Sequence, residues 1–269
     1  MRYGLDLSNF GDLADIGLIA EVAASAEEAG WHGVFLWDHI GRSSAFPPGL
    51  PFADVTVALT AIAQATERVR FGPLVTPLPR RRPQKVAREF VSLDHLSNGR
   101  VVLGVGIGSP IDSEFEAFGE TTDPRTRGDL LDESLDVITA LWTGDRVDYD
   151  GKHLSIHAEG FDPVPVQQPR IPIWVASRWP SKGRTIRRAA RYEGIVPTPM
   201  QDGDSNHLSP DDIAAVRERL DRDDAEIVVT APLKGRAADY ERAGATWLLE
   251  VATSRAEALE RAAAGPPSS

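Results

Sequence analysis

Short apolar stretches alternate with longer segments of helical periodicity along most of the chain. The short stretches are rich in β-branched residues, and the segments between them repeat their apolar positions every three to four residues. This order predicts βα units around a parallel sheet. The expected strands are residues 3–7, 33–37, 69–75, 101–105, 171–176, 194–197, 226–231 and 246–251.

The helical segments end near residues that favour turns. Apolar stripes stop at Gly30, at Asn98 and at Gly144, and residues 237–243 and 255–264 are expected to form the last two helices. Eight units in 269 residues average about 34 residues each, which suits one (β/α)₈ barrel, the TIM barrel. We therefore predict a single domain, with the barrel over residues 1–264 and a proline-containing tail over residues 265–269.

Two connections are longer than one unit requires, and each follows a strand. The first, residues 41–53, follows the second strand. The second, residues 106–170, follows the fourth strand and contains a stretch, residues 147–168, that alternates like a short hairpin. The fold prediction is thus an α/β TIM barrel with insertions after strands 2 and 4. Loops at this end of a barrel often cover a ligand, so residues 41–53 are interpreted as a lid, with a neutral surface insertion as the alternative.

Composition and charge exclude several classes of function. The chain has 29 Lys and Arg against 40 Asp and Glu, a net charge of −11, which disfavours nucleic acid and anionic membrane as partners. It has no cysteine, which excludes disulfides, thiolate nucleophiles and Cys-ligated metals. No apolar run approaches the roughly 18 residues of a membrane span, and the first ten residues do not read as a signal peptide. We expect a cytoplasmic protein without a metal site.

The motifs of several other enzyme classes are missing from the chain. Gly104, Gly106 and Gly108 spell G-x-G-x-G, but Ser109 stands where a dinucleotide-binding fingerprint would continue. The sequence contains no H-E-x-x-H pair and no G-x-S-x-G elbow. Hydrolytic metal or serine chemistry therefore has no support.

Polar residues at three strand ends carry the candidate chemistry. Asp38 and His39 follow the second strand, where a histidine can exchange a proton near neutral pH or simply hydrogen-bond within a loop. Three arginines at positions 80–82 follow the third strand, either to bind an anion or as a solvated start of the next helix. Ser177 and Arg178 follow the fifth strand and precede a helix, which suits a phosphate or a helix N-cap.

Five segments resemble the luciferase-like family of flavin-dependent oxidoreductases, which includes bacterial luciferase, alkane monooxygenases and coenzyme F420-dependent dehydrogenases. They are residues 36–39 (LWDH), 75–88, 93–106 (LDHLSNGRVVLGVG), 149–153 (YDGKH) and 172–177 (PIWVAS). The similarity extends over nearly the whole chain, and residues 93–108 are its most specific part.

The resemblance implies a TIM barrel that binds FMN or coenzyme F420 across its mouth and transfers hydride or oxygen to or from a small organic substrate. It implies that His39 is the proton donor or acceptor, or polarises the substrate, and that Asp38 orients His39. It also implies a bulge in the third strand near Leu74 and Val75, next to Thr76, often with a non-proline cis peptide. An ordinary trans strand end is the alternative.

Further cofactor contacts are implied on the neighbouring strands. Gly106 and Gly108 match positions close to the flavin, where a missing side chain allows close approach, with simple packing of the barrel as the alternative. Ile107 stands where luciferase has an arginine, so the expected phosphate contacts shift to the fifth strand. The residues expected to bind the cofactor are Leu74, Val75, Thr76, Gly106, Gly108, Ala176, Ser177 and Arg178.

Three functions remain open at this point. The first is a flavin- or F420-dependent oxidoreductase or monooxygenase, with a flavin reductase or NAD(P)H as redox partner and a homodimer as the expected assembly. The second is a non-catalytic flavin-binding protein of the same fold, which Ile107 favours. The third is an unrelated TIM-barrel enzyme that binds a sugar phosphate through Ser177 and Arg178.

Overall fold

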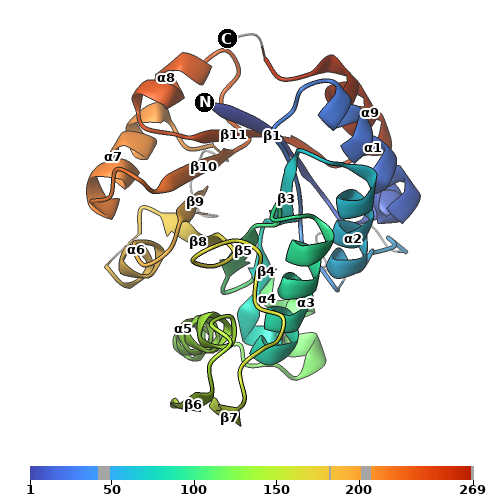
Figure 1. Cartoon of the computed structure of the whole chain (residues 1–269). Coiled ribbons are helices and arrows are strands. Elements are labelled where there is room, and N and C mark those ends of the chain that lie inside the picture. Colours follow the sequence, from blue (N-terminus) through green and yellow to red (C-terminus); the bar gives the residue numbers. More distant parts are fainter. Residues whose placement is uncertain (42–48, 182, 201–206, 268–269) are drawn as a thin grey trace.

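In the computed structural model, parallel strands form the wall of a barrel and helices cover its outside (Figure 1). The structure describes residues 1–41, 49–181, 183–200 and 207–267. The barrel strands are β1 (Arg2–Leu7), β2 (Gly33–Leu36), β3 (Arg70–Pro73), β4 (Thr76–Pro77), β5 (Leu103–Gly106), β8 (Ile173–Trp179), β9 (Gly194–Pro199), β10 (Glu226–Thr230) and β11 (Trp247–Ala252). The predicted α/β TIM barrel is confirmed.

The third predicted strand is divided into two. β3 pairs with β2, whereas β4 pairs with β5, and the cis peptide Leu74–Val75 lies between them. The strand order is β3-β2-β1-β11-β10-β9-β8-β5-β4, and a parallel bridge between Phe71 of β3 and Val101, just before β5, closes the barrel. The predicted bulge and cis peptide are therefore confirmed. The prediction of one continuous strand over residues 69–75 is wrong, because the chain changes its hydrogen-bonding partner within that segment.

A helix of the outer layer follows each barrel strand in chain order, and the divided strand, β3 and β4, is followed by α3. These helices are α1 (Ile16–Glu28), α2 (Val55–Ala65), α3 (Pro83–Leu96), α5 (Pro124–Leu141), α6 (Arg184–Ala189), α7 (Pro210–Leu220), α8 (Ala237–Arg242) and α9 (Arg255–Ala264). Short side chains cap several of them: Asp15, Asp54 and Asp123 accept backbone N–H groups at the starts of α1, α2 and α5. Within the described ranges, no helix is both long and apolar enough to cross a membrane.

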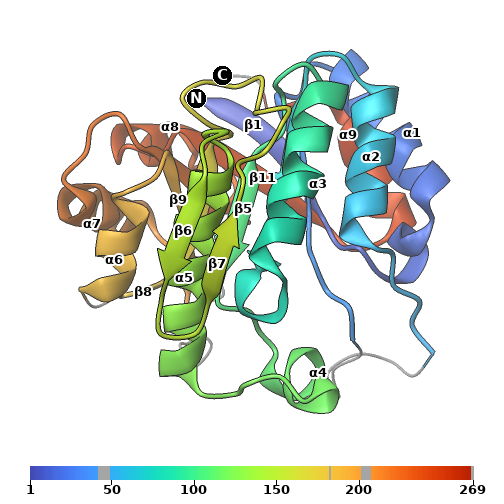
Figure 2. The same cartoon turned by 60° about the horizontal axis from the view of Figure 1, so that its bottom comes forward.

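Both predicted insertions are present. The first joins β2 to α2, but residues 42–48 of the expected lid lie outside the described residues. The second contains α4 (Ile111–Glu114), η3 (Glu116–Phe118), α5 and a hairpin of β6 (Val147–Asp150) and β7 (Ser155–Ala158), as predicted. Figure 2 shows the hairpin against the outside of α5. Glu133 of α5 accepts the backbone N–H groups of residues 152–154 at the hairpin turn, which ties the two together.

Apolar side chains fill the inside of the barrel. The lumen cluster consists of Phe35, Leu74, Val102, Trp174, Val196, Val228, Trp247 and Leu249. Trp174 and Trp247 lie near the starts of β8 and β11, and their ring centroids are 5.1 and 5.7 Å from that of Phe35. Alternate positions of the same strands face the helices and form the larger core. Because apolar groups fill the lumen, polar side chains gather at the carboxyl ends of the strands, where TIM barrels build their active sites.

Short 3₁₀ helices follow two of the barrel strands. The 3₁₀ helices η1 (Gly11–Ala14) and η2 (Leu78–Arg80) follow β1 and β4, respectively. Helix α9 ends at Ala264, and residues 268–269 of the predicted tail lie outside the described residues.

Candidate active site

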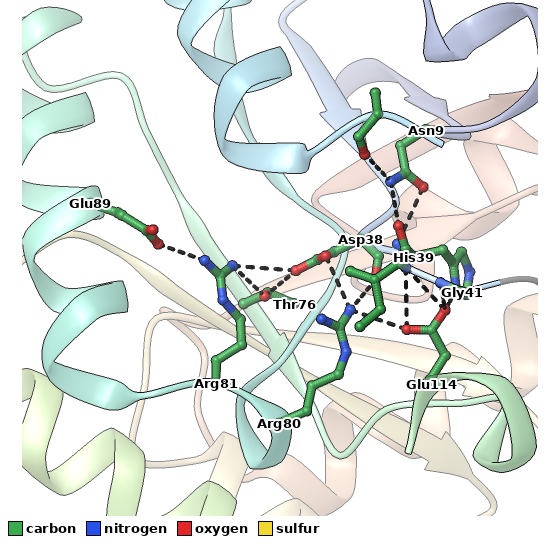
Figure 3. Close-up of polar contacts among 11 residues, drawn as sticks. Asn9, Asp38, His39, Gly41, Thr76, Arg80, Arg81, Glu89 and Glu114 are labelled. Atoms are coloured by element: carbon green, nitrogen blue, oxygen red, sulfur yellow. Dashed lines mark hydrogen bonds and ion pairs between the residues drawn. The ribbon is translucent and has the colours of Figure 1, made fainter. Parts of the chain in front are cut away.

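Asp38 and His39 lie at the carboxyl end of β2, where the sequence placed them. The Leu74 N–H donates to Leu36 O at 2.6 Å, so the end of β2 runs beside the segment that follows β3. Asn9, after β1, holds the His39 main chain: its Nδ2 donates to His39 O at 2.8 Å, and its Oδ1 accepts from His39 N at 3.2 Å (Figure 3). Both residues therefore lie at the barrel mouth. Their catalytic roles remain predictions.

The buried Asp38 carboxylate faces the strand end that follows the cis peptide. The Thr76 hydroxyl donates to Asp38 Oδ2, while Arg80 Nη2 lies 3.1 Å from Oδ1 and Arg81 Nη1 lies 3.4 Å from Oδ2. Arg81 also donates to Thr76 Oγ1 at 3.0 Å and pairs with Glu89 Oε2 at 2.6 Å. These contacts fasten the end of β2 to residues 76–81. That Asp38 orients the His39 ring stays a prediction.

A second carboxylate, from α4, meets the His39 ring (Figure 3). Glu114 is completely buried, and its Oε1 lies 3.1 Å from His39 Nδ1. The same oxygen accepts the backbone N–H groups of Ile40 at 3.2 Å and Gly41 at 3.3 Å, and Arg80 Nη2 lies 3.2 Å from Oε2. Glu114 belongs to none of the motifs that stood out in the sequence. An isolated acid inside a long insertion was the available signal, and it is a weak one.

Aromatic side chains flank His39 at the mouth. The Trp37 ring lies edge-on at a centroid distance of 6.0 Å, and the Phe10 ring lies 6.1 Å away. Phe52 extends this wall, with its ring 5.5 Å from that of Phe10. Trp179 is not part of this wall. It is buried, and its Nε1 donates to Asp212 Oδ1 of α7 at 3.1 Å. The wall therefore offers an apolar surface on which a planar ring or an apolar substrate can pack.

Asp6 is a buried acid inside the barrel that the sequence motifs did not reveal. It lies on β1 in register with Phe35 and Val251, between neighbours that face the helices. Burial raises the pKa of Asp6 to about 7, and a hydrogen bond from Trp37 opposes part of this rise. Among the described residues, its Oδ1 has no hydrogen-bond partner. A single acid in an otherwise apolar strand was the signal that could have identified it.

Four of the expected cofactor residues come together on the lumen side of the mouth. Leu74 belongs to the lumen cluster, and Val75 and Ala176 pack against it. A Cβ atom built on Gly106 would lie 2.8 Å from Val75 Cγ2 and 3.5 Å from Ala176 Cβ. The four residues form an apolar patch suited to a flavin-type ring. The missing side chain of Gly106 makes room for Val75, and its contact with a cofactor stays a prediction.

Packing accounts for Gly108. Its φ is +85°, and an added Cβ would lie 2.5 Å from Phe115 Cζ and 2.8 Å from Pro77 Cβ. Protein side chains therefore fill the space that a side chain would need, which favours the packing interpretation of this glycine. Its expected contact with the cofactor remains a prediction, as does that of Thr76, whose buried hydroxyl binds Asp38.

Ser177 and Arg178 belong to a strand and not to the start of a helix. β8 continues to Trp179 and pairs with β9 through both residues, whereas α6 begins only at Arg184. The interpretation of Ser177 as a helix N-cap is therefore wrong, because the strand extends beyond its predicted end. Alternation along β8 places Arg178 on the same face as Ala176 and directs Ser177 toward the helical layer.

Two buried groups near the ends of β5 and β8 suit an anionic part of a cofactor. Arg127 of α5 donates through Nη1 to Ile107 O at 3.0 Å and Gly108 O at 2.9 Å. Arg127 Nε and Ser177 Oγ are buried without a hydrogen-bond partner in the part of the chain that the structure describes. Burial lowers the pKa of the Arg127 guanidinium, a nearby aspartate opposes this, and Arg178 adds to it. The unpartnered Arg127 Nε and Ser177 Oγ are groups of the kind that bind the phosphate of a flavin-type cofactor.

Arginines 80–82 divide into two internal residues and one at the surface. The side chain of Arg80 is 5% exposed and that of Arg81 is 16% exposed, and both pair with Asp38. Arg82 is exposed and directly precedes α3. The alternative of a solvated helix start is therefore wrong for Arg80 and Arg81, which neutralise carboxylates at the mouth, and it agrees with the exposed Arg82. Binding of an anionic ligand stays a prediction.

Comparison with known proteins identifies a matching family model and related enzymes of known name. A family model described as luciferase-like monooxygenase matches residues 6–263. The chain is 34% identical over 182 residues to an F420-dependent glucose-6-phosphate dehydrogenase of Rhodococcus hoagii, covering 67% of this chain and 52% of that protein. It is 33% identical over 211 residues to the same enzyme of Microbacterium testaceum, covering 75% and 58%. The chain thus spans about half the length of the curated relatives it matches.

Solved structures show the same fold at low sequence identity. An F420-dependent secondary alcohol dehydrogenase in complex with an F420-acetone adduct has a TM-score of 0.77 at 16% identity and covers 96% of both chains. The monooxygenase RslO1 from Streptomyces bottropensis has a TM-score of 0.73 at 19% identity and covers 97% of this chain and 96% of its own. Together with the match over residues 6–263, these findings show that the chain belongs to the luciferase-like monooxygenase family.

Proposed function

We propose that the chain is an F420-dependent oxidoreductase in which His39 moves the proton that accompanies hydride transfer with a small organic substrate. The placement of His39 carries this proposal: its side chain is 19% exposed, lies at the barrel mouth and stands beside the Trp37 ring. Histidine is suited to proton exchange near neutral pH. The similarity to F420-dependent dehydrogenases supports the choice of cofactor. Membership of the luciferase-like family argues against an unrelated sugar-phosphate barrel.

Two groups of residues at the mouth would bind different parts of the cofactor. Leu74, Val75 and Ala176 would pack on the ring, and Arg127 and Ser177 would hold its phosphate. Bound there, F420 supplies the carbon that accepts or releases the hydride. The protein contributes orientation, a dry apolar wall and the proton-transfer group.

The proton and the hydride leave the substrate separately. We take an alcohol, or the carbonyl compound formed from it, as the substrate class, because the F420-dependent relatives are named as dehydrogenases of a sugar phosphate and of a secondary alcohol. In the oxidation direction, His39 would take the hydroxyl proton, and F420 bound at the mouth would accept the hydride of the neighbouring C–H bond. Reduction of the carbonyl returns both by the same route, so charge and electrons balance in each direction.

An FMN-dependent monooxygenase is the second candidate. The description of the family model and the monooxygenases among the structural neighbours favour it. A flavin reductase or NAD(P)H would then supply the electrons, whereas an F420 enzyme exchanges them with its substrate. A non-catalytic flavin-binding protein remains a third candidate, because Ile107 stands where luciferase has an arginine. A homodimer is also a proposal, which light scattering of the purified protein would test.

Titration of the purified protein with F420 and, separately, with FMN tests the proposal. We expect F420 to saturate one site per chain, followed by its absorbance and fluorescence, and FMN to bind at least about tenfold more weakly, a difference of about 1.4 kcal/mol. Tight binding of FMN without binding of F420 would support the monooxygenase candidate. Binding of F420 without turnover of any alcohol or carbonyl compound would support the non-catalytic candidate.

A matched pair of serine variants locates the cofactor on the protein. Ser177→Ala removes the buried hydroxyl and should weaken F420 binding severalfold, since one hydrogen bond contributes about 1 kcal/mol. Ser92→Ala removes a hydroxyl that donates within α3, to Arg88 O, and should leave F420 affinity unchanged. Equal affinities in both variants would argue against a phosphate at Ser177.

A further inference from the structure

We propose that Glu114 is a positioning residue that determines which ring nitrogen of His39 exchanges the proton. The effect of Glu114 on turnover rests on the proposed function. Its effect on the tautomer of His39 concerns the protein without cofactor or substrate. Glu114 comes from α4, in the insertion after β5, and reaches back to the end of β2 (Figure 3). It is therefore supplied by an element far along the chain from the histidine that it contacts.

Polar or charged groups lie beside both carboxyl oxygens of Glu114. Oε1 faces His39 Nδ1 at 3.1 Å and the backbone N–H groups of Ile40 and Gly41 at 3.2 and 3.3 Å. Oε2 faces Arg80 Nη2 at 3.2 Å. The His39 ring nitrogen can donate or accept, but the two backbone N–H groups at Oε1 can only donate and the guanidinium at Oε2 is positively charged. A carboxylate, which can only accept hydrogen bonds, is the form that suits all of these neighbours.

A carboxylate at this position selects one tautomer of the neutral imidazole. Because Glu114 can only accept, His39 Nδ1 must carry the hydrogen of their contact, and the lone pair of the ring lies on Nε2. Nε2 is then the nitrogen that takes the substrate proton. When it does so, the negative charge 3.1 Å from Nδ1 stabilises the imidazolium that forms.

The same chain contains a carboxylate with a purely structural role, which serves as an internal control. Glu133 of α5 is buried and accepts the backbone N–H groups of Lys152, His153 and Leu154 at 2.8 to 3.0 Å. Like Glu114 at Ile40 and Gly41, Glu133 anchors a turn by accepting backbone N–H groups. Its bonds with His153 come from the backbone N–H of that residue, whereas Glu114 contacts the ring of His39. A difference between the two glutamates therefore reports the contacts that Glu114 makes and Glu133 lacks, which are those with the His39 ring and with Arg80.

Nitrogen NMR of the cofactor-free protein tests the tautomer directly. With ¹⁵N-labelled histidine, the His39 signals are assigned by their loss in His39→Ala, and we expect the Nδ1–H form in the wild type. In Glu114→Gln, either the oxygen or the amide group can face Nδ1, so both tautomers should be populated. Glu133→Gln should leave the His39 signals unchanged. An Nε2–H form in the wild type would overturn the proposal without any variant, and so would an unchanged His39 spectrum in Glu114→Gln.

Turnover provides the second measurement and separates the two proposals. Glu114→Gln should lower kcat about 10²-fold, the scale of a proton-transfer group, while KM and the Kd of F420 stay within about twofold. Glu133→Gln should match the wild type in all three. Equal kcat in Glu114→Gln and the wild type would overturn the positioning role. A wild type that shows the Nδ1–H form but neither binds F420 nor turns over would contradict the proposed function and leave the assignment of Glu114 intact.

Discussion

Arg80 donates twice to Asp38: its Nη2 lies 2.7 Å from the main-chain oxygen and 3.1 Å from the side-chain Oδ1. The same nitrogen lies 3.2 Å from Glu114 Oε2. One guanidinium therefore joins the end of β2, the turn after β4 and helix α4. All three side chains are at most 5% exposed, and this cation compensates the charge of both carboxylates, whereas Arg81 contacts only Asp38 of the two.

Replacing Arg80 should destabilise the fold strongly. Arg80→Met leaves two buried carboxylates without their shared cation, and removal of one partner from a buried ion pair costs about 3–5 kcal/mol. Urea unfolding measures the change in free energy. Arg82→Met, at the exposed neighbour, should change stability by less than about 0.5 kcal/mol. Equal stability of the two variants would show that the ion pairs around Arg80 contribute little.

Gly108 should tolerate alanine less well than a glycine of similar backbone conformation elsewhere. Gly108→Ala places a Cβ 2.5 Å from the Phe115 ring, whereas Gly235, at φ +70°, has no atom within 4 Å of a built Cβ. Both variants carry the cost of a positive φ, and only Gly108→Ala adds overpacking of about 1–3 kcal/mol. Thermal or urea unfolding of the pair gives the difference. Indistinguishable stabilities would mean that Phe115 moves aside freely.

Asp6 should make stability fall as the pH rises from about 4 to about 7. Its pKa is raised from 3.8 to about 7 in the folded protein, so in this window the unfolded chain has released a proton that the folded protein retains. The contribution of the neutral carboxyl is full below pH 4 and lost above pH 7. One pKa unit corresponds to about 1.4 kcal/mol, so the loss amounts to a few kcal/mol.

Asp6→Asn removes this dependence, because the amide does not titrate. Urea unfolding between pH 4 and pH 8 should show the variant gaining stability relative to the wild type as the pH rises. Asp12→Asn, at an exposed aspartate of η1, controls for the general effect of removing a negative charge. Parallel stability curves for the wild type and Asp6→Asn would contradict the raised pKa.

His39 should affect turnover and not cofactor binding. In His39→Ala, we expect kcat to fall about 10²- to 10⁴-fold, the usual contribution of general acid–base catalysis, with an F420 Kd close to that of the wild type. His95→Ala is the control: its Nε2 contacts Val164 O at 2.8 Å on the outside of the barrel, and kcat should not change. An unchanged kcat in His39→Ala would remove the proton-transfer role.

Much of the fold could be predicted from local patterns. Burial of one strand face or helix stripe repeats with a fixed period, so the βα order, the insertions after strands 2 and 4 and a hairpin within residues 147–168 follow from local patterns. The polar residues after β2 were also predictable, because the strand that precedes them sets their place at the mouth. These features depend on neighbours within one element.

The tertiary structure decided the partners of each charged residue. Asp38 and His39 are adjacent in sequence, yet Asp38 meets arginines after β4 while His39 meets Glu114 from a later insertion. The burial of Asp6 and the division of the third strand between β2 and β5 likewise depend on barrel closure. Such contacts join segments far apart in the chain, and charge compensation in a buried site depends on distance in space. The sequence by itself determined the scaffold and the location of His39, whereas the packing of the closed barrel determined which carboxylate contacts it.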